Sequence, residues 1–488
     1  MLGVERTFGA SGSIIDARTH GDATMEFLVR IEARLAGRVV KTCDVAMIAR
    51  PGVVMGGEEL GLSLEDGKEI VRELQSRMIA VQVEMLEAAT SLRIHCGRRK
   101  DIKDRRPRQF RTVFGVVRVR RRRFIFCTCR GGKARNEWPL RDLGRSSTTP
   151  ELRYLFAKFG SDVPYRKAAQ LLTELLPLPN GGVSHTTVRR HTLLVGERFD
   201  QRALEPDEYD WPDCQREPVI PAHRMTVAID GTYIRAGLDS WNRQLHVVAG
   251  RVDRDGKLGS HFAWIARESV ASCHMKAILE DQGCNSNSRV AVLADGADGL
   301  GGIVRRAIPQ TPRTILDWFH ISMRLRHIEQ MGPSMMELFP EVEALGRISR
   351  LRHKMWNGQW RGALHRMRDC YQGIRAIAKT VTSLHAERVK RFRRHLIDLR
   401  DYLLSNQENL TNYGKARRDG LRISSAPAES GMNHLINKRM GKRQPMRWSP
   451  DGAHLLLQVR CAVLDHRLEM LFREWFPRFR ATPPLSPL

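Results

Sequence analysis

The sequence predicts an α/β protein with a mixed central sheet in residues 225–330. Two observations carry this prediction. Short apolar runs typical of buried strands alternate with longer helical patterns in the order β-β-β-α-β-α-β-α. The three opening strands follow one another closely, which favours antiparallel pairing, and the later strands are separated by helices, which favours parallel crossovers.

The elements of this region are expected in close succession. Strands are expected at 225–230, 246–252, 260–265, 289–294 and 313–316, and helices at 271–281, 298–308 and 318–329. This is the element order of a ribonuclease-H-like fold, in which the first and fourth strands lie side by side. The carboxyl ends of these two strands are therefore expected to be neighbours.

The whole chain has 488 residues, more than one core usually organises. A long amphipathic helix is expected at 67–92, from its apolar residues at helical spacing. The expected division is a helical N-terminal region (1–94), a basic β-rich ribbon-like segment (95–150), a helix-turn-helix domain (151–204), a Pro-rich acidic linker (205–224), the first part of the core (225–330), a basic helical insertion (331–423), the last part of the core with a Glu-bearing helix (424–475) and a disordered tail (476–488).

The chain is strongly basic, with 81 Lys and Arg against 54 Asp and Glu and a formal net charge of +27. The excess is concentrated, because residues 98–123 hold thirteen Lys and Arg and residues 347–400 hold fifteen. Two solvated basic faces are the alternative, but contact with phosphates explains this density more simply. It predicts DNA binding that weakens steeply with salt.

The composition also bears on membranes and redox state. No apolar run approaches the ~18 to 20 residues that span a bilayer. The N-terminus lacks the charged start and apolar core of a signal peptide. We therefore expect no membrane association, a cytoplasmic location and reduced thiols for the nine Cys.

A possible DNA reader lies in residues 165–191. The run that begins at Tyr165 is followed by a Pro/Asn/Gly turn and then by Val183-Ser-His-Thr-Thr-Val-Arg-Arg-His, which is similar to a helix-turn-helix. Ser184 is expected to cap the second helix, from which Arg189 and Arg190 would project toward a groove, together with His185 and Thr186. Any two-helix hairpin with a capped second helix would give a similar pattern, and the charge distribution favours the DNA reader.

Four side chains near the basic segment are candidate zinc ligands. A tetrahedral zinc site needs four sulfur or nitrogen ligands in paired short spacings, and His95, Cys96, Cys127 and Cys129 supply four. The adjacent pair and the Cys-x-Cys spacing are atypical of zinc knuckles. A degenerate, metal-free ribbon is therefore the favoured alternative.

Three acidic residues form the main candidate site. Asp230 and Asp295 are each expected to end a strand before a Gly, and Glu429 opens a polar helix that Pro427 could start. Neighbouring carboxylates repel unless a cation bridges them, so two Mg²⁺ or Mn²⁺ ions roughly 4 Å apart are the expected occupants. Taken one by one, the acids could instead be turn residues and a solvated helix acid. Their joint placement in a basic protein favours the metal site.

Six segments together carry a family resemblance. They are Thr112-Val-Phe-Gly-Val-Val-Arg-Val-Arg-Arg, Val183-Ser-His-Thr-Thr-Val-Arg-Arg, Asp230-Gly-Thr, Asp295-Gly-Ala, Asp317-Trp-Phe-His and the helix of Glu429. With these, roughly residues 95–465 resemble bacterial insertion-sequence transposases of the DDE class, close to the ISKra type and more distantly similar to Mutator-like transposases.

The resemblance implies roles for particular residues. Asp230, Asp295 and Glu429 would be the metal-binding triad, and Asp317 and His320 would form the signature that precedes a helical insertion. For these last two residues, a strand-ending Asp and a packed His remain an alternative to a DNA or active-site role.

The expected activity is metal-dependent phosphoryl transfer on DNA, in which the element ends are cut and joined to a target. The partners would be double-stranded DNA, with terminal inverted repeats and a target, and other copies of the chain in a homodimer or larger oligomer. Two alternatives are a non-catalytic, site-specific DNA-binding regulator and a structure-specific ribonuclease-H-like nuclease. Further DNA contacts are expected from Lys438, Arg439, Arg443 and Trp448.

Overall fold

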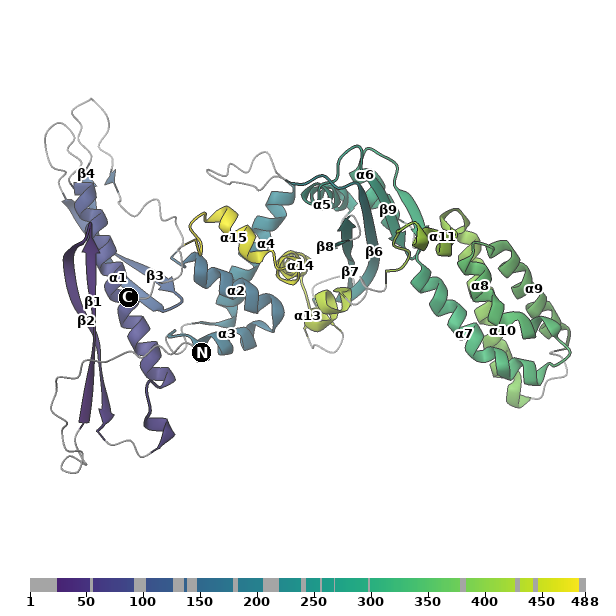
Figure 1. Cartoon of the computed structure of the whole chain (residues 1–488), viewed down its shortest axis with the longest axis horizontal. Helices are drawn as coiled ribbons and strands as arrows, with labels where there is room; N and C mark the ends of the chain where they lie inside the picture. The colour runs from purple at the N-terminus through teal and green to yellow at the C-terminus, as the bar shows by residue number, and fades with distance from the viewer. Residues whose placement is uncertain are drawn as a thin grey trace, which may run out of the picture. The chain divides into compact units, whose positions relative to one another are not determined.

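The computed structural model describes residues 24–52, 56–91, 102–125, 136–137, 147–178, 183–204, 219–237, 243–254, 257–266, 268–296, 299–377, 383–425, 431–441 and 446–481. The described part is a mixed α/β protein, as predicted. The chain divides into two compact units (Figure 1). One is assigned Met1–Arg153 and Ala169–His185, and the other Tyr154–Ala168 and Thr186–Leu488.

The first unit contains two antiparallel hairpins and a long helix. Strands β1 (Thr24–Leu35) and β2 (Arg38–Pro51) form one hairpin, and β3 (Ile102–Thr112) and β4 (Gly115–Ile125) form the other, to which the short β5 (Asn136–Glu137) is added. Helix α1 (Leu64–Ser91) follows the short 3₁₀ turn η1 (Gly57–Glu59) and contacts β2 and β4. Val83 of α1 packs on Phe110 and Val117 in a small core.

The prediction of a helical N-terminal region (1–94) is therefore wrong for residues 24–51, which form the two strands β1 and β2. Phe27, Val29 and Ile31 alternate with other side chains at a period of two, which is the period of a strand. Ala36 and Gly37 connect the strands with positive φ values of 50° and 79°, as a two-residue hairpin turn requires. The predicted α1 and the basic β-rich segment at β3 and β4 are confirmed.

The second unit is built around a five-stranded sheet in the order β10-β9-β6-β7-β8. Its strands are β6 (Arg224–Arg235), β7 (Gln244–Arg254), β8 (Lys257–Ile265), β9 (Arg289–Ala294) and β10 (Arg313–Leu316). The first three pair antiparallel, whereas β6, β9 and β10 run parallel. The predicted neighbourhood of the first and fourth strands, β6 and β9, is confirmed.

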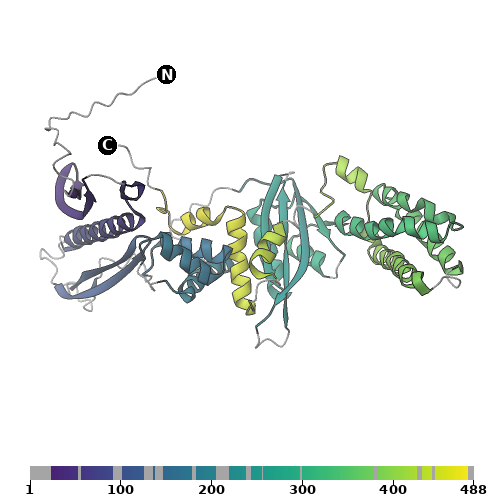
Figure 2. The same cartoon turned by 90° about the horizontal axis from the view of Figure 1, so that it is seen from below.

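Helices cover both faces of this sheet. Helices α5 (Glu268–Asp281) and α6 (Leu300–Ala307) bury Met275, Leu279 and Val304 against one face. On the other face, α14 (Pro450–Leu464) packs Leu456 and Leu457 into a core with residues of β7 and β8. Figure 2 shows this C-terminal part, in yellow, beside the teal sheet.

A helical region with its own core follows β10. Its elements are α7 (Trp318–Leu338), η3 (Glu343–Arg350), α8 (Leu351–Trp356), α9 (Trp360–Ile377), α10 (Ser383–Ser405), η5 (Gln407–Asn409) and α11 (Tyr413–Arg418). The helical character predicted for 331–423 is confirmed. Helix α7 runs through residue 330 without a break, however, so the helical region grows directly out of the core. Its apolar residues, such as Phe392 and Leu399, are buried in one cluster that reaches the sheet at Leu293.

The remaining helices lie before the sheet and at the C-terminal end. Helices α2 (Pro150–Asp162), α3 (Tyr165–Leu175) and α4 (His185–Leu204) lie where a helix-turn-helix was predicted. A π-helical turn (η6, Asn433–Asn437) leads into α13 (Lys438–Met440), and α15 (Leu468–Trp475) follows α14. Phe479 is buried against Tyr154 and Phe472, so a disordered tail is wrong for 476–481. Residues 482–488, and 205–218 of the predicted linker, lie outside the described residues.

Candidate functional site

The strand register places two of the predicted acids at the same level of the sheet. Strands β6 and β9 pair in parallel from Arg224 opposite Arg289 to Ala228 opposite Leu293. Continued by two residues, which passes the end of β9 at Ala294, this register would bring Asp230 level with Asp295. Asp295 directly follows β9, as predicted.

Asp230 does not end its strand, and that prediction is corrected. Strand β6 continues to Arg235 because β7 pairs with it along its whole length, with Asp230 opposite Ala249. What ends near Asp230 is the parallel pairing with β9. The carboxylate therefore lies close to the point where the neighbouring strand β9 ends.

The turn after β9 is held by the helical region. Gly296 has a φ of 87°, and a Cβ there would lie 2.4 Å from the side-chain oxygen of Asn406. The hydroxyl of Tyr402, on α10, donates a hydrogen bond of 2.8 Å to the carbonyl oxygen of Asp295. Helix α10 thus fixes the backbone that presents the Asp295 carboxylate.

Asp317 anchors two segments at the same edge. It is 1% exposed and caps α7 by accepting a hydrogen bond of 3.0 Å from the backbone N–H of Phe319. It also accepts hydrogen bonds from the backbone N–H of Ser425, at 3.0 Å, and from the Ser425 hydroxyl. Its own backbone N–H donates to the carbonyl oxygen of Ala294, at 3.0 Å. Asp317 therefore joins the end of β9 to the chain that leads into residues 426–430.

His320 lies one helical turn after this cap. Its Nε2 atom is 3.6 Å from Oδ2 of Asp317, and its side chain is 23% exposed. Its charge acts on Asp230, as does that of Asp317. Asp317 thus follows strand β10 and caps α7, as the structural interpretation of the Asp-x-x-His signature expects, and His320 lies next to it.

The Asp230 carboxylate is partly buried and lies near two other negative charges. Burial raises the pKa of Asp230 above its usual value, and the negative charges of Asp295 and Asp317 add to that effect. The Gly231 N–H, which donates a hydrogen bond of 2.7 Å to Asp230, and the His320 ring act in the opposite direction. A bound cation would relieve the repulsion.

Several predicted site residues lie outside the described residues. They are the third acid Glu429, the candidate zinc ligands His95, Cys96, Cys127 and Cys129, and the DNA-binding candidate Arg443.

Of the other predicted DNA-binding residues, some are exposed and some are buried, and the exposed ones lie on α4 and α13. Arg189 and Arg190 are exposed on the first turns of α4, next to the exposed His185, whereas Val188 and Thr192 face inward. The inward face is fixed because the Thr192 hydroxyl donates a hydrogen bond of 3.1 Å to the carbonyl oxygen of Phe156 on α2. Lys438 is also exposed, and its Nζ atom pairs with Asp162 at 3.0 Å.

Arg439 and Trp448 are corrected from DNA contacts to core residues. Arg439 is 1% exposed, and its guanidinium lies 4.8 Å from the Tyr165 ring centroid and 5.1 Å from that of Trp448. Trp448 is 6% exposed and pairs with Arg235 through its backbone N–H. Burial lowers the pKa of Arg439. Neither side chain is available to a phosphate or a base.

Sequence reasoning missed a second candidate metal site. Asp200 of α4, His274 of α5 and His454 of α14 place their ligand atoms within 4.8 Å of one another, and no other such group occurs in the described part of the chain. The Nε2 atoms of His274 and His454 lie 2.6 and 2.7 Å from Oδ1 of Asp200. These three side chains could hold a metal ion.

Opposing effects act on the acidity of Asp200. Burial acts to raise its pKa, but the hydrogen bonds and charges of His274 and His454 outweigh burial and hold the pKa below its usual value. The three residues are 74 and 180 positions apart in sequence, which is no motif spacing.

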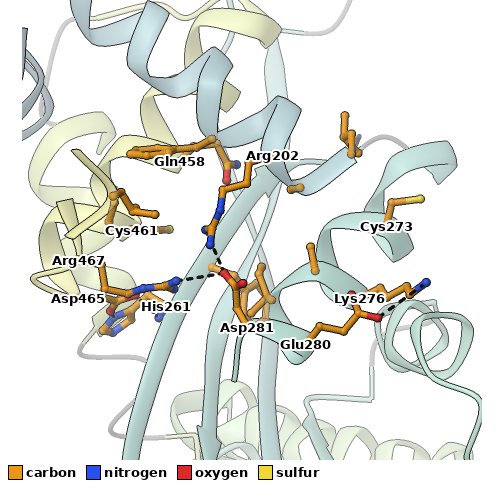
Figure 3. A pocket seen from close by; sticks show the side chains of 18 of the residues that line it. Arg202, His261, Cys273, Lys276, Glu280, Asp281, Gln458, Cys461, Asp465 and Arg467 are labelled. Atoms are coloured by element: carbon orange, nitrogen blue, oxygen red, sulfur yellow. Dashed lines mark hydrogen bonds and ion pairs between the residues drawn. The ribbon is translucent and has the colours of Figure 1, made fainter. Parts of the chain in front are cut away.

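The same three helices line a cavity of about 450 Å³ (Figure 3). Its charged side chains pair with one another. Oδ2 of Asp281 lies 3.3 Å from Nη1 of Arg202 and 3.1 Å from Nη2 of Arg467, and the His261 ring lies 2.6 Å from Oδ1 of Asp465. These pairs brace α4, α5 and the C-terminal helices around the cavity.

Comparisons with known proteins add no family to this description. No protein-family model matches the chain, and no curated protein matches it either. Among the helices that the structure describes, none combines the length and apolar character needed to cross a membrane.

Proposed function

We propose that the chain is a DDE-class transposase of an insertion sequence, with a ribonuclease-H-like core that cuts element ends and joins them to target DNA. One observation carries the proposal. Asp230 lies on β6 and Asp295 directly follows the neighbouring parallel strand β9, close enough for its charge to act on Asp230, in a sheet of order β10-β9-β6-β7-β8.

The site residues would share the chemistry as follows. Two Mg²⁺ or Mn²⁺ ions would supply an activated water or 3'-hydroxyl and charge stabilisation at the leaving oxygen. Asp230 and Asp295 would hold them together with Glu429, which sequence assigns to the site. Asp317 would position the Glu429 segment through its hydrogen bonds to Ser425. The raised pKa of Asp230 supports this assignment, since crowded carboxylates favour a cation.

The basic elements would bind the DNA backbone. Strands β3 and β4 place Arg105, Arg118 and Arg120 on their exposed sides, and α4 exposes Arg189 and Arg190. Such contacts neutralise phosphates without reading sequence. The partner would be double-stranded DNA with terminal inverted repeats and a target, bound by a homodimer or larger oligomer, since two ends must be paired for transfer.

The test is cleavage and joining of a DNA fragment that carries the sequences flanking the coding region. We expect Mg²⁺- or Mn²⁺-dependent nicking at the element ends followed by joined products. The Asp230→Asn protein should bind the same DNA and leave it intact, because it keeps the shape of the site and loses one ligand charge.

The other outcomes separate the alternatives. Specific binding of the flanking DNA with no cleavage by either protein would overturn the proposal in favour of a DNA-binding regulator. Metal-dependent cleavage that follows DNA structure, without joining, would favour a nuclease. Inverted repeats around the coding region, and repeated genomic copies, are a further expectation of the transposase.

A further inference from the structure

We propose that Asp200, His274 and His454 bind one Zn²⁺ ion that fastens α4 to α5 and α14. The inference does not depend on the proposed function, because it uses neither the carboxylate edge nor DNA.

Hydrogen-bond geometry fixes which nitrogen of His274 faces Asp200. Nδ1 of His274 lies 2.9 Å from the carbonyl oxygen of Val270, which can only accept, so this nitrogen carries a proton. Nε2 is then the ring nitrogen that faces Oδ1 of Asp200, 2.6 Å away, and it is the nitrogen that a metal ion would bind.

The pattern at His274 is one that metal-binding histidines show. A ligating imidazole usually donates its other N–H to a backbone carbonyl or a carboxylate, which fixes the ring. The Val270 carbonyl does so here from one turn earlier in α5. His454 is 8% exposed, and its Nδ1 atom has no hydrogen-bond partner, so Nε2 provides the polar contact of that ring.

The separations need only a small adjustment to fit zinc. Bonds of 2.0–2.1 Å in a tetrahedron put ligand atoms about 3.3 Å apart. The two histidine nitrogens lie 2.6 and 2.7 Å from Asp200 Oδ1, so the side chains would open by roughly 0.6 Å. The Asp200 side chain is 23% exposed, and a water on that side would complete four ligands.

The donor set distinguishes zinc from the ions expected at the sheet edge. Imidazole nitrogens suit Zn²⁺, whereas Mg²⁺ prefers oxygen ligands. The two sites of this unit would therefore take different metals. The zinc ion would hold α4 against α5 and α14. Helix α4 already approaches α14 closely at Gly196, where a Cβ would lie 2.3 Å from the Leu455 carbonyl oxygen.

The test is the zinc content of the purified full-length protein. Cys127 and Cys129 are first replaced by Ser, so that an ion held by that segment does not contribute. We expect about one zinc per chain in this background, and about one tenth of that or less after His274→Ala or His454→Ala. His261→Ala is the matched control, because it breaks a buried His–Asp pair with Asp465 that has no third ligand. It should leave the zinc content unchanged.

A second measurement covers variants that fail to fold. Co²⁺ added to the metal-free Cys-to-Ser protein should produce the visible absorption of a tetrahedral site, and one equivalent of Zn²⁺ should abolish it. Three results would overturn the proposal: no zinc and no cobalt spectrum in the folded Cys-to-Ser protein, zinc retained after His454→Ala, or iron in place of zinc. The first would leave the cluster as a hydrogen-bonded network.

Discussion

Asp230 and Asp200 are both partly buried in the same unit, yet their surroundings shift their acidity in opposite directions. Asp230 faces other carboxylates at the edge of the sheet, and its pKa is raised by burial and by Asp295. Asp200 faces two imidazoles between helices, and their hydrogen bonds lower its pKa in spite of burial. Burial acts to raise the pKa of both carboxyls: it prevails at Asp230, and the two histidines together outweigh it at Asp200.

The ionised Asp230 carboxylate lowers the stability of the fold, whereas the ionised Asp200 carboxylate raises it. A carboxylate with a raised folded-state pKa destabilises the fold while it is ionised, and such strain is common where function needs crowded charges. A carboxylate with a lowered pKa stabilises the fold while it is ionised. In the absence of metal, the two sites should therefore respond oppositely to neutralisation.

The largest expected effect is on activity. Asp230→Asn should lower DNA cleavage by about 1,000-fold, since a metal ligand supports several kcal/mol of transition-state stabilisation. In metal-free protein the same change should raise the midpoint of thermal unfolding, because it removes a buried like charge. Cleavage rates test the predicted loss of activity, and melting curves of the metal-free protein test the predicted gain in stability.

The control is Asp253→Asn in the same sheet. Asp253 is 5% exposed and pairs with Arg251 and Arg422, each at 3.0 Å. Its neutralisation should lower the melting midpoint. If both Asn variants lowered it equally, the contrast between crowded and paired carboxylates would not hold.

The second prediction concerns Asp200. Asp200→Asn should destabilise the metal-free protein by about 2 kcal/mol, the usual worth of hydrogen bonds to a charged group. Its folded-state pKa is lowered, so this contribution is present above the unfolded value of about 3.9 and is lost as the pH falls further. Denaturant unfolding of both proteins in the presence of a chelator, at pH 7 and in acid, measures the loss of stability and its dependence on pH. A difference from wild type that persists unchanged in strong acid would contradict the assignment.

The sheet-edge site could be predicted better than the Asp200 cluster, because the cluster's ligands are far apart in the sequence. Strands β9 and β10 and the position of Asp295 could be predicted, because a short apolar run that ends in Asp-Gly is a local pattern. The Asp200 cluster could not, because three helices far apart in sequence must pack before its ligands meet. The length of β6 was also missed, since it depends on its pairing with β7.

Two other predictions that were wrong have different causes. The N-terminal hairpin carries a local two-residue period that would have revealed it. By contrast, Arg439 and Trp448 looked like DNA contacts because sequence shows their charge and aromatic ring but not the Tyr165 ring that covers Arg439. Long-range packing decided their burial.

A smaller effect is expected when the contact between Ser425 and Asp317 is weakened. Ser425→Ala removes the hydrogen bond that the Ser425 hydroxyl donates to Asp317, keeps the one from the Ser425 backbone N–H, and should cost about 1 kcal/mol of stability. If Asp317 positions the Glu429 segment, cleavage should fall about tenfold, beyond what the stability change explains. Measuring cleavage well below the melting range separates the two. Unchanged cleavage would limit Asp317 to capping α7.

The smallest effect is expected at Tyr402. Tyr402→Phe deletes the hydrogen bond to the Asp295 carbonyl, worth about 1 kcal/mol, and should reduce cleavage by less than tenfold. Tyr371→Phe is the matched control, because Tyr371 accepts a hydrogen bond of 3.0 Å from Arg393 within the helical region. Only the Tyr402 variant should change cleavage. Equal losses in both would point to a general loosening of the helices.

Iron-directed cleavage of the protein backbone would test the central claim most directly. Fe²⁺ replaces Mg²⁺ at carboxylate sites, and the radicals it generates with ascorbate and peroxide cut the nearest peptide bonds. We predict cuts near Asp230, Asp295 and Glu429 that disappear with excess Mg²⁺ and in Asp230→Asn. Cuts confined to other segments, or cuts at these positions that persist in Asp230→Asn, would contradict a metal site at this edge of the sheet.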